Sequence, residues 1–179
     1  MADRVLRKAV FLDRDGTIIR DENYLRDPAR ITMVPGAPAA LKALRAVGRA
    51  LVVITNQSGI ARGLITASEH DAVRIAFEAA LAAEGVTLDG YYFCPHGPEE
   101  GCPCRKPKTG LLDQASLDLH LDLRRSFMVG DRESDILAGK NAGCKTAFLS
   151  GGGPQLDYGA DVCGSDWDAL LQGILRHDL

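Results

Sequence analysis

The chain has no long hydrophobic run. Within its 179 residues, no apolar stretch approaches the roughly 20 residues that a membrane-spanning helix needs. Residues 1–8 also lack the apolar core of a secretory signal peptide. Internal repeats, low-complexity tracts and linker-like segments are absent too. We therefore expect a cytoplasmic protein with no membrane association, built as a single domain over residues 1–179.

The chain also has little net charge. It carries 21 Lys and Arg against 24 Asp and Glu, for a formal net charge of −3. Nothing in this balance attracts the surface as a whole to nucleic acid or to an anionic membrane. The content of 46% hydrophobic and 25% charged residues is typical of globular domains. We expect a small-molecule partner and no nucleic-acid partner.

Short apolar runs alternate with longer amphipathic stretches along the chain. Continuous apolar runs predict strands buried on both faces, and their alternation with helices predicts a parallel sheet. We therefore expect an α/β fold with a Rossmann-like parallel sheet and helices on both faces. The predicted strands are residues 8–12, 50–55, 90–93, 126–129, 145–149 and 161–163, and the predicted helices are residues 35–46, 66–84, 111–119, 134–141 and 166–176.

Two carboxylates follow the first predicted strand. Asp13 and Asp15 are two residues apart, so they project to the same side of an extended chain, and Gly16 permits a sharp turn behind them. Like charges this close are costly unless a cation or a shared proton compensates. The pattern indicates a divalent metal site or an acid/base pair; a strand followed by a solvated Asp-Gly turn is the plainer alternative.

Polar residues follow two further strands. Thr55 ends the second predicted strand and residues 56–59 follow it, and Asp131 follows the fourth strand. Because ligands bind at the carboxyl ends of strands in open parallel sheets, we expect these segments to meet at one edge. Their order suits phosphoryl transfer, with Asp13 as nucleophile and Asp15 as general acid and base.

The remaining groups of this set would serve the phosphate and a cation. Thr55 offers a hydroxyl to a phosphate, and Lys106 offers a fixed positive charge. Asp131 would complete an oxygen-rich Mg²⁺ site together with Asp13.

Four ordered segments resemble the motifs of the haloacid dehalogenase superfamily of phosphatases. They are residues 13–17, 53–56, 105–107 and 129–135. The resemblance implies that Asp13 is the nucleophile, Asp15 the general acid and base, and Thr55 and Lys106 the stabilisers of the transferred group. It further implies that Mg²⁺ is held by Asp13, the Asp15 main-chain carbonyl and Asp131, with Asp135 as a supporting carboxylate.

A second metal site is predicted within a loop. Five cysteines are present, and Cys94, Cys102 and Cys104 crowd together with His96. In a reducing compartment such a cluster indicates metal rather than disulfides. Cys3His is a closed tetrahedral set that suits structural Zn²⁺, so residues 94–104 form a zinc-stapled loop; a loop with free cysteines is the alternative.

The zinc loop and residues 56–63 resemble a subgroup that acts on heptose bisphosphates and histidinol phosphate, whose members lack a large cap domain. The resemblance implies a Mg²⁺-dependent phosphatase with structural Zn²⁺. The substrate-binding residues that it implies are Asp21, Glu22, Asn23, Tyr24, Thr55, Asn56, Gln57, Ser58, Arg105, Lys106 and Arg132.

We expect hydrolysis of the C7 phosphate of a heptose bisphosphate by a monomeric enzyme, in the ADP-heptose route to lipopolysaccharide. Three alternatives remain. Histidinol phosphate would need the same chemistry on another alcohol. A DNA 3′-phosphatase would need a basic groove, which the net charge of −3 disfavours. A non-enzymatic, zinc-stapled interaction module would explain the cysteines but not the series Asp13, Thr55, Lys106 and Asp131.

Overall fold

The computed structural model describes residues 6–152 and 156–177. Its centre is a six-stranded parallel sheet with the order β3-β2-β1-β4-β5-β6. Residues 1–5, which belong to the segment considered for a signal peptide, lie outside the described part. The strands are β1 (Ala9–Leu12), β2 (Ala50–Asn56), β3 (Gly90–Cys94), β4 (Phe127–Gly130), β5 (Lys145–Leu149) and β6 (Val162–Gly164).

Helices connect the strands, and short 3-10 turns interrupt the loops. The helices are α1 (Ala37–Ala46), α2 (Ala67–Ala83), α3 (Gly110–Leu119), α4 (Glu133–Ala142) and α5 (Trp167–Arg176). The 3-10 helices are η1 (Pro28–Arg30), η2 (Pro98–Glu100) and η3 (Leu123–Arg125).

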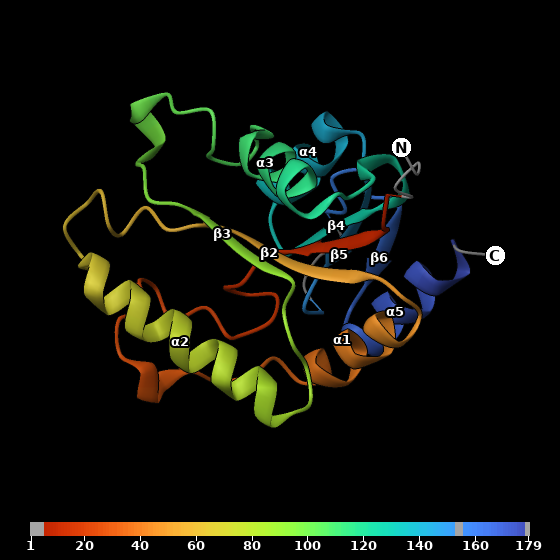
Figure 1. Ribbon diagram of the computed structural model, residues 1–179, viewed down its shortest axis with the longest axis horizontal. Coiled ribbons are helices and arrows are strands. Elements are labelled where there is room, and N and C mark those ends of the chain that lie inside the picture. Colours follow the sequence, from red (N-terminus) through yellow and green to blue (C-terminus); the bar gives the residue numbers. More distant parts are fainter. Residues whose placement is uncertain (1–5, 153–155, 178–179) are drawn as a thin grey trace, which may run out of the picture.

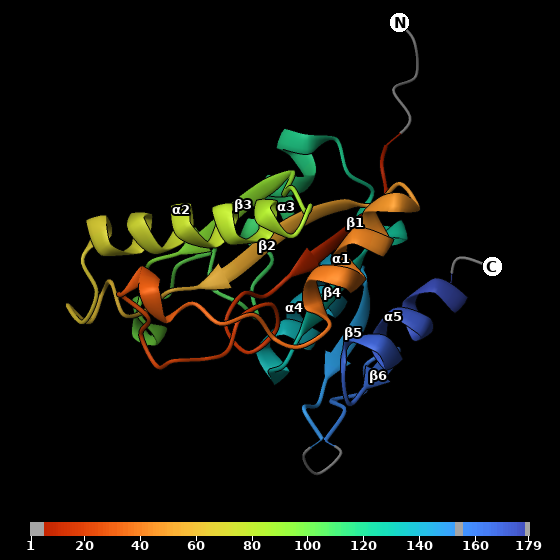
Figure 2. The same cartoon turned by 90° about the horizontal axis from the view of Figure 1, so that it is seen from below.

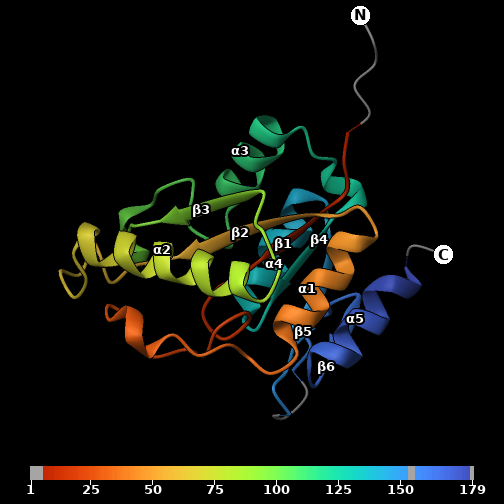
Figure 3. The ribbon, with the colours of Figure 1, turned by 60° about the horizontal axis from the view of Figure 1, so that its bottom comes forward.

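The helices cover both faces of the sheet (Figure 1). On one face, α1, α2 and α5 pack on alternate strand residues such as Val10 and Val53. On the other face, α3 and α4 pack on the intervening residues, among them Phe11 and Ile54. Figure 3 shows α1 and α5 lying together on their face, with α3 on the opposite side. Because the four central strands, β2, β1, β4 and β5, are buried on both faces, their sequences are mostly continuously apolar rather than alternating.

The predicted Rossmann-like architecture is confirmed. Each predicted strand and helix is present, with bounds within two residues of those expected. Thr66, one of two candidate caps, starts α2: its hydroxyl accepts a bond from the Glu69 amide while the Glu69 side chain reaches back to the Thr66 amide. The three 3-10 helices were not predicted, because single turns leave no periodic apolar pattern.

The order of the strands predicts which edge of the sheet binds ligands. The chain leaves β1 for β2 on one side, and β4 pairs with β1 on the other, so connections diverge between β1 and β4. In open α/β sheets, ligands bind at such a switch point, outside the carboxyl ends of the strands. Figure 2 shows β1 and β2 pointing toward the side where the chain after β1 curls.

No large cap domain covers this edge within the described residues. Between β1 and α1 the chain contains only η1 and isolated bridges, and between β2 and α2 it contains no further helix or strand. Among the described helices, none combines the length and apolar character required to cross a bilayer.

Burial on the α2 face is the main source of that helix's stability. Phe77 is 0% exposed at the centre of the α2 packing, whereas Ile75, two residues earlier, is 60% exposed. We expect Phe77→Ala to lower the free energy of unfolding by about 3–5 kcal/mol, because it leaves a cavity in a close-packed layer. Ile75→Ala is the matched control and should change it by less than about 1 kcal/mol. Urea unfolding of both variants, followed by circular dichroism, measures the difference; equal losses would contradict this account of the core.

Candidate active site

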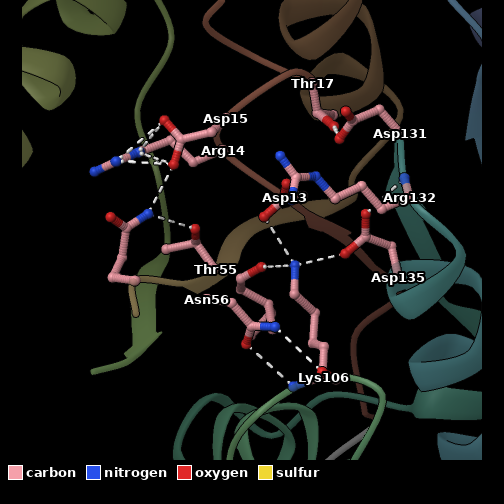
Figure 4. Close-up of polar contacts among 12 residues, drawn as sticks. Asp13, Arg14, Asp15, Thr17, Thr55, Asn56, Lys106, Asp131, Arg132 and Asp135 are labelled. Carbon is pink, nitrogen blue, oxygen red and sulfur yellow. Dashed lines mark hydrogen bonds and ion pairs between the residues drawn. The ribbon is translucent and has the colours of Figure 1, made fainter. Parts of the chain in front are cut away.

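Lys106 lies at the centre of the carboxyl edge of the sheet. Its ammonium is buried and donates to Asp13 Oδ1 at 2.8 Å, to Asp135 Oδ1 at 2.7 Å and to the Ile54 carbonyl at 2.7 Å. Burial alone would lower the pKa of Lys106, but the carboxylates of Asp13 and Asp135 outweigh it and raise that pKa to about 12. The lysine is therefore a permanent positive charge beside Asp13 (Figure 4).

Asn56, the last residue of β2, holds the Lys106 backbone in place. Its side-chain amide donates to the Lys106 carbonyl at 3.2 Å, and its oxygen accepts from the Lys106 amide at 3.1 Å. The paired bonds fix the loop that delivers the lysine. Asn56 was predicted to bind substrate; it lines the cavity described below, but both polar atoms of its side chain already bond to this backbone.

Three carboxylates converge on one point: Asp13 directly after β1, Asp131 directly after β4 and Asp135 in the first turn of α4. Oxygens of Asp13, Asp131 and Asp135 lie within 4.8 Å of one another. Burial and the charges of Asp13 and Asp135 raise the pKa of Asp131 to about 7. Carboxylates so closely grouped repel one another unless a cation compensates, and an all-oxygen donor set suits Mg²⁺. The residues present therefore fit a divalent cation.

Two glycines make this close approach possible. Gly16 has φ +85°, and a Cβ there would come within 2.2 Å of Asp131 Oδ2. A Cβ at Gly130 would come equally close to Asp135. A side chain at either position would displace a carboxylate of the group.

Asp15 lies on the other side of Asp13 from these carboxylates (Figure 4). Both of its oxygens accept from the Arg14 guanidinium at 2.9–3.2 Å, and Oδ2 accepts from Gln57 Nε2 at 2.7 Å. The same Gln57 nitrogen lies 2.9 Å from the Thr55 hydroxyl. Burial raises the pKa of Asp15, and the Arg14 charge opposes that rise. Asp13 and Asp15 thus face the same edge in two different electrostatic environments.

A cavity of about 200 Å³ opens beside these groups. Of the predicted substrate-binding residues, all except Glu22 line it; the Glu22 carboxylate instead pairs with Arg30. The lining comprises Asp13, Asp15, Asp21, Asn23, Tyr24, Leu25, Thr55, Asn56, Gln57, Ser58, Gly59, Arg105, Lys106, Arg132, Ser134 and Asp135.

Sequence reasoning did not place Leu25 and Ser134 in the cavity, whereas Gly59 was expected there with the segment that follows the second strand. Ser134 lies three residues after Asp131, which was expected at the sheet edge, so its place in the cavity could have been predicted from this proximity. Leu25 carries no such signal, because its side chain is apolar and it reaches the cavity only through the path of its loop.

An ion pair closes one wall of the cavity. Arg132, the cap of α4, donates to Asp21 Oδ2 at 2.6 Å and so ties the loop after β1 to the end of β4. Asn23 and Tyr24 in that loop have φ of 48° and 63°. Such values are uncommon for residues other than glycine, and here they accompany the turn that brings Tyr24 into the cavity wall.

The predicted zinc ligands come together. His96 Nδ1 lies 3.2 Å from Cys104 Sγ and 3.6 Å from Cys94 Sγ, and Cys102 Sγ lies 3.4–3.6 Å from the other two sulfurs. A tetrahedron with Zn–S bonds of about 2.3 Å has edges of roughly 3.7 Å. The four donors therefore fit one zinc ion. The loop is also clasped by Lys108, whose ammonium donates to the carbonyls of Gly101 and Cys102.

Arg105 directly follows the last of these ligands. Its guanidinium donates to the His96 carbonyl at 3.2 Å, and its side chain lines the cavity. The cluster thus sets the position of Arg105, while Asn56 sets that of Lys106.

Comparisons with known proteins identify a family and several relatives of this chain. Residues 103–160 match the family described as HAD-hydrolase-like. The chain is 44% identical over 150 residues to the D-glycero-beta-D-manno-heptose-1,7-bisphosphate 7-phosphatase of Pasteurella multocida, covering 80% of this chain and 82% of that protein. It is 40% identical over 166 residues to the protein of the same name from Escherichia coli, covering 89% and 86%.

Solved structures of similar proteins share the fold of this chain. The D,D-heptose 1,7-bisphosphate phosphatase of B. bronchiseptica, crystallised with magnesium and phosphate, superimposes with a TM-score of 0.83 at 31% identity, covering 95% of this chain and 99% of that one. A putative HAD-like phosphatase from Mesorhizobium loti gives the same TM-score at 37% identity and covers 98% of this chain and 91% of its own. The chain therefore belongs to the HAD phosphatases, in the family of the D-glycero-beta-D-manno-heptose-1,7-bisphosphate 7-phosphatases.

Proposed function

We propose that this phosphatase removes the C7 phosphate of D-glycero-β-D-manno-heptose 1,7-bisphosphate through an aspartyl-phosphate at Asp13. The observation that carries the proposal is the Asp13 carboxylate held 2.8 Å from the Lys106 ammonium, with Asp15 across the cavity, in a chain whose relatives bear that activity in their names.

In this proposal Asp13 attacks phosphorus as the bond from phosphorus to the sugar oxygen breaks. Asp15 gives a proton to the departing alcohol and later takes one from the water that hydrolyses the aspartyl-phosphate. Lys106 and the Thr55 hydroxyl stabilise charge on the transferred group. The burial that raises the pKa of Asp15 favours the protonated form that the first step requires.

We propose Mg²⁺ as the catalytic cofactor, held by Asp13, Asp131 and the Asp15 main-chain carbonyl. When bound, the ion supplies positive charge to the phosphate oxygens. The three-carboxylate group supports this assignment, and the relative from B. bronchiseptica was crystallised with magnesium and phosphate. Asp135 would act through Lys106, to which it is bonded.

We propose structural Zn²⁺ at Cys94, His96, Cys102 and Cys104. Four protein ligands leave no open position for catalysis, so this ion would order the loop that carries Arg105. Thiols kept available for a metal need a reducing compartment, which supports a cytoplasmic location.

Arg105 and Arg132 would recognise the part of the substrate that is not being hydrolysed. Both line the cavity, where Arg105 donates to the His96 carbonyl and Arg132 donates to Asp21. A planar guanidinium binds phosphate through paired bonds, so a second phosphate is the natural ligand for Arg105. Asp21, Asn23, Tyr24, Gln57 and Ser58 complete the proposed wall, from which Glu22 is absent.

The alternatives find less support. The relatives are named for the heptose bisphosphate and not for histidinol phosphate, and membership of a phosphatase family disfavours the non-enzymatic module. A net charge of −3 disfavours a nucleic-acid substrate. We further propose that residues 1–179 form one domain that acts as a monomer.

The nucleophile can be tested directly. Asp13→Asn should lower kcat by several orders of magnitude, because an amide does not form the aspartyl-phosphate. Steady-state phosphate release with the heptose bisphosphate and Mg²⁺ measures the effect. Asp168→Asn, an exposed carboxylate at the start of α5, is the matched control and should retain full activity. If Asp13→Asn keeps more than about a tenth of the rate, Asp13 is not the nucleophile.

The two metal sites should respond differently to chelation. Dialysis against EDTA should stop turnover, and Mg²⁺ alone should restore it while about one zinc per chain stays bound, since structural zinc is coupled to the folding of its loop. Cys102→Ser should lose zinc by elemental analysis. Cys163→Ser, an exposed cysteine outside the cluster, should keep it. Equal zinc in both variants would count against the cluster.

Arg105 should determine preference for a bisphosphate. We expect Arg105→Ala to raise KM for the heptose bisphosphate by roughly 10- to 150-fold, equivalent to about 1.5–3 kcal/mol of charge-assisted bonding. The KM for a monophosphate such as histidinol phosphate should change much less. Arg124→Ala, in η3, is the control. Equal losses of kcat/KM for both substrates would show that Arg105 does not bind the second phosphate.

A further inference from the structure

Arg14 is a buried cation that the proposed chemistry does not use. In the sequence it stands between Asp13 and Asp15, and its side chain is only 1% exposed. Its Nε and Nη2 atoms donate to both oxygens of Asp15 at 2.9–3.2 Å, and its Nη1 atom donates to Tyr91 Oη at 3.0 Å. Burying a guanidinium costs several kcal/mol unless its donors are satisfied, so this placement calls for a function.

Tyr91 binds the Nη1 atom of the Arg14 guanidinium and is itself in contact with a histidine of α2. It lies on β3, and its hydroxyl is 3.4 Å from His70 Nε2 on α2. Arginine only donates hydrogen bonds, so the Tyr91 oxygen accepts from Arg14 and its own proton is directed to His70. Burial lowers the pKa of His70 to about 4, so the ring is neutral at neutral pH. The tautomer with its proton on Nδ1, which lies 3.8 Å from Asp71 Oδ1, leaves Nε2 to accept from Tyr91.

The histidine ring is itself fixed. It packs on Phe93 with ring centroids 4.2 Å apart and is 2% exposed. The result is a directional series of contacts from α2, through β3, to the end of β1. Gln57 approaches the same Asp15 carboxylate from the end of β2. Arg14 and Gln57 thus reach the Asp15 carboxylate from the ends of two different strands, and Tyr91 of β3 anchors Arg14.

We propose that Arg14, Tyr91 and His70 are positioning residues that hold the Asp15 carboxylate at the cavity for proton transfer to the leaving alcohol. Arg14 transfers no proton; the proton moves from Asp15 to the sugar oxygen as the bond from phosphorus to that oxygen breaks. Tyr91 keeps the guanidinium fork in plane with the carboxylate, and His70 keeps the Tyr91 hydroxyl directed away from Arg14. The inference rests on the proposed role of Asp15 as general acid.

The test compares substrates that need the proton with substrates that do not. An alkyl phosphate such as the heptose bisphosphate releases a poor leaving group that must be protonated, whereas p-nitrophenyl phosphate releases a good one. The value of kcat/KM reports only the steps up to release of the alcohol, before hydrolysis of the aspartyl-phosphate. A defect in positioning the acid should therefore lower kcat/KM for the alkyl phosphate selectively.

Tyr91→Phe is the sharpest variant, because it removes one oxygen from a buried ring and leaves the core filled. We expect kcat/KM to fall roughly tenfold for the heptose bisphosphate, since small misplacements of a catalytic group cost up to about a hundredfold, and to change by less than about twofold for p-nitrophenyl phosphate. Arg14→Lys, which keeps the charge but loses the fork, should show the same selectivity.

Tyr92→Phe is the matched control. Tyr92 is the next residue of β3, and its hydroxyl donates to Asp118 on the other side of the sheet. It should leave both substrates unchanged, and zinc content together with urea unfolding should show that every variant is folded.

Asp15→Ala separates the two hypotheses. If it shows no dependence on the leaving group, the proposed role of Asp15 fails. If the loss of kcat/KM in Asp15→Ala depends on the leaving group and that in Tyr91→Phe does not, the positioning proposal is overturned. This holds whether Tyr91→Phe lowers kcat/KM equally for both substrates or for neither.

Discussion

The site depends on one buried ammonium. Lys106 is the point at which four segments meet, since it bonds to Asp13 after β1, to the Ile54 carbonyl of β2 and to Asp135 of α4, and it arrives on the loop that follows the zinc-ligand cluster. Each bond uses one of its three protons. The lysine therefore fixes the separation of strand ends that lie far apart in the sequence.

The balance of charges in the site explains why its carboxylates need a divalent cation. Asp13, Asp131 and Asp135 are grouped around Lys106, while Arg14 pairs with Asp15. With the three grouped carboxylates ionised, their excess of two negative charges over Lys106 matches what one divalent ion would neutralise. Without such an ion, burial and the neighbouring carboxylates raise the pKa values of Asp131 and Asp135 to about 7 and 6.

Much of the fold and the site was readable from the sequence. The apolar runs gave the strands because a sheet covered on both faces has no polar side, and the spacing of Asp13 and Asp15 indicated their shared edge. The cluster of cysteines with His96 could also be predicted, because all four donors lie close together in the sequence, within residues 94–104. The 3-10 turns, the absence of Glu22 from the cavity and the presence of Leu25 in it depend on how loops pack, which no local pattern records.

The sequence by itself determined which chemical groups are available and on which strand ends they sit, because strand periodicity and glycine turns are local properties. Only the tertiary structure decided what each group faces. Asn56 bonds to the Lys106 backbone, and Asp15 is held by Arg14. The hydroxyl of Tyr91, 77 residues further along the chain, anchors that arginine. Apart from the pair of neighbours Arg14 and Asp15, these contacts join residues from different elements, so they arise from the packing of the sheet and not from the order of residues along it.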